Sequence, residues 1–169
     1  MRRPVPLEGN LHLLRQGIEL LGRLPDSAYM DAAPDRSTVG AQYRHILDHY
    51  RCLLDGLTAG EVDYDQRLRD PEVERDRGAA TRATQELLDR LRLLSRSHLG
   101  LPLRVLQSAG DTEPEEPQGS SLGRELLFLV SHTVHHYAII KLLLGERGVD
   151  CDANFGVAPS TLAYRRAAG

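Results

Sequence analysis

The sequence predicts an all-α protein, a four-helix bundle that forms a single domain over residues 1–169. Apolar residues recur at three- and four-residue spacing in four long segments, the pattern of helices that bury one face. Glycine, proline or a small hydroxyl residue stands at most segment ends, and no sheet pattern of comparable strength separates them. With 169 residues and a hydrophobic content of 41%, one domain can bury a core of its own.

The first two helices have recognisable ends. Leucines at helical spacing predict a helix over residues 7–24, which Pro25 terminates. Ser37 or Thr38 suits the N-cap of a second helix, because a side-chain oxygen there accepts a free backbone N–H. That helix is expected to run to about residue 57, shortly before a glycine.

The last two helices follow the same rules. A stripe of alanines and leucines predicts a third helix over residues 76–98. Ser120 or Ser121 is expected to cap a fourth helix, which runs to residue 144 before Gly145.

The connections between helices are long enough to permit at least one crossover. Residues 61–76 hold seven acids and three arginines around Pro71 and are expected to be a solvated connection. Residues 100–107 alternate apolar side chains and can form one short strand, and residues 108–119 form a loop broken by proline and glycine. The tail, residues 151–166, has no strong period and is expected to pack back as a loop and a short turn.

Composition excludes several classes of partner. A net charge of −3 and a pI near 6.2 give no electrostatic basis for binding nucleic acid or an anionic membrane. The apolar runs are expected to be too short to span a bilayer, and no signal peptide is expected at the N-terminus. Cys52 and Cys151 lie far apart, which indicates free thiols and a cytoplasmic protein.

Two of the helices each carry a pair of histidines on an apolar face. The segment LVSHTVHHYAIIKLLL, residues 129–144, contains His132 and His136 four apart, so both lie on one side of the helix. A helical-wheel projection places His132 and His136 in the middle of the apolar stripe that is expected to face the core. In the second helix, His45 and His49 are also four apart, opposite a charged side made of Arg44, Asp48, Arg51 and Asp55.

Without a metal, the ring nitrogens of four inward-facing imidazoles have few hydrogen-bond partners. An unpaired buried polar group costs roughly 1–3 kcal/mol, and the inward faces offer few partners beyond Gln42, Glu125 and tyrosine hydroxyls. A divalent ion satisfies several nitrogens at once, and imidazole suits Zn, Ni, Fe or Cu. The alternative is a set of core histidines that each make a hydrogen bond. Because a catalytic site keeps one position open, three ligands are expected. Thr133 stands where the HExxH signature has glutamate, so that signature is absent.

The opposite face of the last helix is also apolar, which is unusual for a helix at the surface of a bundle. A second covered face is typical of a subunit interface, and a homodimer is predicted. The residues of this face are Leu127, Val130, Val134 and Ala138.

The stretches STVGAQYRHILDHY and SSLGRELLFLVSHTVHHYAIIKLL together resemble the DinB-like (DinB/YfiT) superfamily of metal-binding four-helix bundles. The resemblance covers nearly the whole chain, with a first histidine in the second helix and HxxxH in the last. It implies that His45, His132 and His136 are the metal ligands and that His49 is a neighbouring group or a substitute ligand. It also implies homodimers and a divalent transition metal, with Zn favoured over Ni or Fe.

The function expected from these features is that of a metal-dependent enzyme with a small-molecule substrate. Relatives in the superfamily imply a hydrolase or a transferase that uses a low-molecular-weight thiol. His49 is expected to act as a proton shuttle, and Asp48 and Glu125 could orient a ligand imidazole, although Asp48 is expected to be a surface charge. The alternatives are a non-haem iron oxidative enzyme on the same site and a dimeric bundle that binds metal or a small ligand without turnover.

Overall fold

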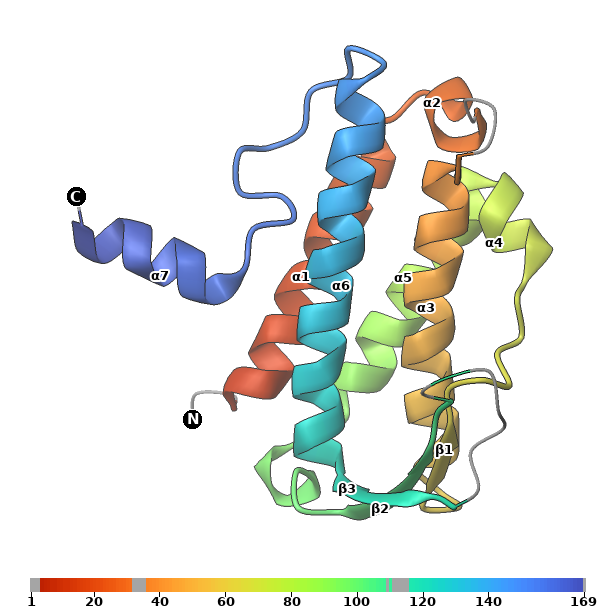
Figure 1. Cartoon of the computed structure of the whole chain (residues 1–169), viewed down its shortest axis with the longest axis vertical. Helices are drawn as coiled ribbons and strands as arrows, with labels where there is room; N and C mark the ends of the chain where they lie inside the picture. The colour runs from red at the N-terminus through yellow and green to blue at the C-terminus, as the bar shows by residue number, and fades with distance from the viewer. Residues whose placement is uncertain (1–3, 32–35, 109, 111–115, 169) are drawn as a thin grey trace.

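The computed structural model describes residues 4–31, 36–108, 110 and 116–168. Within these residues, four long helices pack as a bundle, and a small three-stranded sheet closes one end (Figure 1). The predicted all-α bundle is therefore confirmed. The long helices are α1 (Val5–Arg23), α3 (Val39–Gly56), α5 (Arg77–Arg92) and α6 (Leu122–Gly145).

Helices α3 and α6 begin at cap residues that the sequence predicted. Thr38 caps α3, because its Oγ1 accepts the Ala41 N–H at 2.9 Å, and Ser121 caps α6. The third helix is shorter than predicted: α5 ends at Arg92, and a single 3₁₀ turn, η1 (Arg96–His98), follows. Helix α5 closes at Leu93, whose backbone N–H is donated to the Arg90 and Leu91 carbonyl groups. Ser95 then begins the 3₁₀ turn, because its side chain and backbone pair with His98 in a capping box.

The sheet and the short helices lie in segments that the sequence presented as connections. Strand β1 (Glu61–Asp63) pairs in parallel with β2 (Pro102–Leu106), which pairs antiparallel with β3 (Gln118–Ser121). The strand predicted in 100–107 is thus present, but the solvated connection predicted for 61–76 is wrong, since it holds β1 and α4 (Pro71–Arg75). A further short helix, α2 (Asp26–Met30), follows α1.

The buried stripe of α6 is centred on Thr133 and Tyr137, not on the histidines. Thr133 is fully buried and donates to the Tyr50 hydroxyl, which in turn donates to Asn10 of α1. His132 and His136 lie beside this stripe and are only partly buried, so their predicted place at the centre of the core face is wrong. Thr133, which stands where the HExxH signature has glutamate, is therefore part of a structural hydrogen-bond network.

The tail packs back on α6 over residues 151–157, as expected. The Phe155 ring is buried and stacks on Tyr137, with centroids 4.4 Å apart, and the Lys141 ammonium donates to three carbonyl groups of the same loop. The short turn expected next is instead a ten-residue helix, α7 (Pro159–Ala168), which projects away from the bundle (Figure 1).

Helix α6 has the length and composition of a membrane span. Its 24 residues include a window with a mean hydropathy of 1.4, so the sequence argument that the apolar run is too short is wrong. The core helix of a soluble bundle meets the same criterion, and α6 lies against α1 and α3 with partly buried histidines along it.

Candidate metal site

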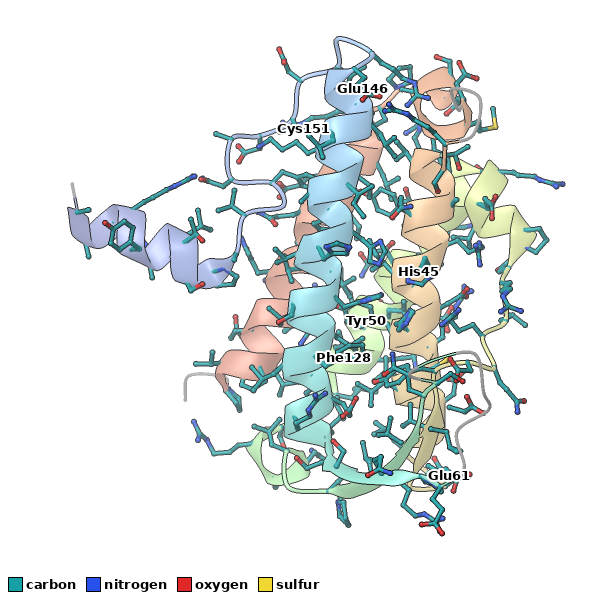
Figure 2. The ribbon with its side chains drawn as sticks, in the orientation of Figure 1. His45, Tyr50, Glu61, Phe128, Glu146 and Cys151 are labelled. Carbon is teal, nitrogen blue, oxygen red and sulfur yellow. The ribbon has the colours of Figure 1, made fainter. Side chains whose placement is uncertain are left out.

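Three histidines from two helices converge in the bundle. His45 of α3 and His132 and His136 of α6 each offer one ligand nitrogen, and these atoms all lie within 4.8 Å of one another. Figure 2 shows His45 midway along α3, on the part of the helix that lies beside α6. The ring centroids of the three are 4.5–5.0 Å apart. The side chains assigned as ligands from the sequence are therefore brought together.

His49 belongs to the same cluster but is held differently. It is 2% exposed, and its ring centroid is 4.0 Å from that of His132 and 4.5 Å from that of His45. Its Nδ1 is 2.8 Å from the His45 backbone oxygen. Because a carbonyl oxygen only accepts, Nδ1 carries the proton and Nε2 carries the lone pair.

The environment keeps the three candidate ligands neutral. Burial, followed by the neighbouring histidines, lowers the pKa of His45 to about 3, that of His132 to about 2 and that of His136 to about 4. A neutral imidazole has a free lone pair, which is the form that binds a metal. The donor set is therefore in its metal-binding state at neutral pH.

One fully buried ring nitrogen of the cluster has no hydrogen-bond partner within the part of the chain that the structure describes. His132 Nε2 is buried, so leaving it unpaired carries a desolvation cost. A divalent transition ion between the three imidazoles would pair with this atom. The residues present thus fit the metal that the resemblance implies.

The orienting groups differ from those expected. Asp48, expected as a surface charge, is buried, and its carboxylate is 3.3 Å from the Arg44 guanidinium. Burial raises the pKa of Asp48, with Arg44 opposing that shift. Glu125 accepts from the hydroxyl groups of Tyr64 and Ser120. Within residues 4–31, 36–108, 110 and 116–168, neither acid forms a hydrogen bond with a histidine, so the expectation that they orient a ligand imidazole is not met.

An aromatic wall, made of Tyr64 and Phe128, borders the histidines on the side of the sheet. The Tyr64 ring stacks on His49 with centroids 5.4 Å apart and planes inclined by 22°. Phe128 (Figure 2) lies 5.3 Å from Tyr64 and 5.5 Å from His132 between centroids. Tyr64 directly follows β1, so the small sheet positions this wall. Sequence patterns did not predict this wall, because a strand of three residues has too little pattern to be recognised.

A family model and a solved structure both connect the chain with DinB-like proteins. A family model described as the DinB superfamily matches residues 14–140. FK506-binding protein 5 of Rhizopus delemar is 30% identical over 159 residues, which are 93% of this chain but 40% of that protein. A DinB-like protein from Bacillus cereus has a solved structure that aligns with a TM-score of 0.58 at 16% identity, covering 90% of this chain and 99% of that one. At that identity the alignment shows a shared fold.

Proposed function

The chain belongs to the DinB superfamily, and on that basis we propose that it is a metal-dependent enzyme whose single divalent ion is held by His45, His132 and His136. The observation that carries the proposal is the convergence of three neutral imidazole nitrogens within 4.8 Å, one of them buried and unpaired. Zn is favoured over Ni or Fe, because a tetrahedral site with three protein nitrogens is common for catalytic zinc.

Three neutral ligands leave the full positive charge of the ion in place and one coordination position open. When bound, such an ion lowers the pKa of a water or thiol that it binds, which suits hydrolysis or thiol transfer. The substrate is proposed to be a small molecule, and the second reactant either water or a low-molecular-weight thiol.

His49 is proposed to receive the proton that either nucleophile must lose. Its Nδ1–H is used by the His45 carbonyl, which leaves the Nε2 lone pair as the only acceptor on the ring. The Tyr64 ring restricts the rotation of His49 and covers it from solvent. A base with one acceptor atom in a fixed direction is what general-base chemistry requires.

Metal analysis tests the proposal directly. Protein purified without a histidine tag and re-exposed to Zn, Ni or Fe is expected to hold about one ion per chain. Each single change of His45, His132 or His136 to alanine is expected to empty the site. Wild-type protein that holds no ion would overturn the proposal and return the histidines to the role of core residues.

The reaction class needs a separate measurement. Turnover of ester or amide substrates in water supports a hydrolase, and turnover only with an added thiol supports a transferase. Oxygen consumption by the iron-loaded protein would instead identify non-haem iron chemistry, and stoichiometric metal without any turnover would identify a binding protein.

A further inference from the structure

Gln42 makes the shortest polar contact to any of the candidate ligands that the structure describes. It lies in the first turn of α3, one turn before His45, and its Oε1 is 2.6 Å from His136 Nδ1 on α6. An amide oxygen only accepts, so Nδ1 of His136 must carry the proton. The lone pair of that imidazole is then on Nε2.

The amide of Gln42 is itself held in one orientation. Its Nε2 donates to Ser37 Oγ at 3.0 Å, and the Ser37 hydroxyl is directed at the Thr38 carbonyl oxygen, 3.4 Å away. Because that hydroxyl has one hydrogen and gives it to a carbonyl, it accepts from the amide N–H. This arrangement favours the orientation in which the amide oxygen faces His136.

We propose that Gln42 is a positioning residue for the metal site. It fixes the tautomer and ring orientation of His136, so that Nε2 is the ligand atom, and it does so from the helix that supplies His45. This inference rests on the proposed function. It also assigns to a neutral side chain the role that metal sites often give to a carboxylate, so Gln42 adds no negative charge beside the ion.

The first test measures the tautomer without any metal. In metal-free protein, the ¹⁵N chemical shifts of the His136 ring are expected to show a proton on Nδ1 in the wild type. In Gln42→Met, which keeps the side-chain length but has no acceptor, the proton is expected to distribute between the two nitrogens. A wild-type His136 with its proton on Nε2 would overturn the inference.

The second test measures Zn²⁺ affinity in the full chain by competition with a chromophoric chelator. Gln42→Met is expected to weaken binding about 10- to 100-fold, the usual effect of losing a group that orients a ligand. Gln42→Glu retains the acceptor and is expected to bind at least as tightly as the wild type. Gln85→Met is the matched control, since Gln85 is exposed on α5 and bonds only Asp89 among the contacts recorded for it.

The outcomes separate this inference from the proposed function. Wild-type protein that binds Zn²⁺ while Gln42→Met binds it equally tightly overturns the role of Gln42 alone. Equal losses in Gln42→Met and Gln42→Glu also overturn it, because a side chain that only packs would not distinguish an acceptor from a thioether. Wild-type protein that binds no Zn²⁺ overturns both.

Discussion

The imidazole of His49 donates its Nδ1 proton to the backbone carbonyl of His45, one helical turn earlier, at 2.8 Å. The two histidines of α3 are therefore not equivalent. A ring nitrogen of His45 belongs to the cluster of potential ligands. In His49, one ring nitrogen is already used in a hydrogen bond to the backbone of its own helix. This difference supports the proposal that His45 is a ligand and His49 a neighbouring base, a distinction that an i, i+4 pair in the sequence could not provide.

Substitution of His49 is expected to reduce activity while retaining the metal. His49→Gln keeps a donor for the His45 carbonyl but has no basic nitrogen, so the rate of the chemical step should fall about 10²- to 10⁴-fold, the usual worth of a general base. Metal content and kcat, measured on the same preparation, give the result. His45→Ala is the comparison and is expected to lose the metal. A variant of His49 that loses the metal, beside a variant of His45 that keeps it, would place the third ligand one turn further along α3.

The stability of the metal-free protein is expected to fall as the pH falls below about 6.5, the ordinary pKa of histidine. In the folded chain, burial lowers the pKa of His45, His132 and His136 to about 3, 2 and 4. Between these values and about 6.5, the unfolded chain binds more protons than the folded one, so acid favours unfolding. Thermal unfolding in the presence of a chelator, measured from about pH 8 to about pH 5, gives the change of melting temperature with pH.

The control for the pH prediction is a variant that has one fewer buried histidine. His132→Gln should show a shallower loss of melting temperature with acid, whereas His12→Gln, at an exposed position on α1, should follow the wild type. A wild-type melting temperature that does not change over this range would show that the histidines titrate normally in the folded chain.

The sequence predicted the helices and the two histidine pairs because both depend on local spacing. Positions four apart share a helix face whatever the rest of the chain does, so His45 could be paired with His49 and His132 with His136. The choice of His45, His132 and His136 as the three ligands came from the resemblance to the DinB-like superfamily. Strand β1 was missed because Glu61–Asp63 pairs through its backbone and has a single apolar residue. The orienting role of Gln42 depends on a contact between α3 and α6, and no local pattern records such a contact.

Removal of the Phe155 ring is expected to detach the tail loop from α6. Phe155 is 3% exposed and stacks on Tyr137, so Phe155→Ala should lower the free energy of unfolding by about 3 kcal/mol, the low end for a buried phenylalanine. Lys141→Met removes three hydrogen bonds to carbonyl groups near the surface and should cost about 1 kcal/mol. Denaturant unfolding gives both values.

Hydrogen exchange distinguishes a loosened tail from a loosened bundle. In both variants, faster exchange is expected over residues 151–157 and on the adjoining turns of α6, while α3 and α5 keep their protection. If Phe155→Ala left the exchange of the loop unchanged, the stack on Tyr137 would not be what holds it.

Homodimer formation remains a prediction, and the structure narrows the surface that could support it. Val130 lies against Gly9 of α1, and the tail passes so close to Ala138 that a side chain at Gly156 would meet its backbone at 2.7 Å. The chain therefore covers part of the apolar back face of α6 by itself. Leu127 of that face is 51% exposed, and Leu142, one helical turn after Ala138, is 71% exposed. These two leucines are the residues that a second copy is expected to cover.

Light scattering at micromolar concentration is expected to give about twice the chain mass of 18.8 kDa. Leu127→Glu and Leu142→Glu should each shift the protein toward the monomer, because a charge would be buried in the interface without a partner. Leu93→Glu is the control, since Leu93 is 81% exposed beyond the end of α5 and should leave the mass unchanged. A wild-type monomer would show that these two leucines are isolated apolar residues of the kind that most protein surfaces carry.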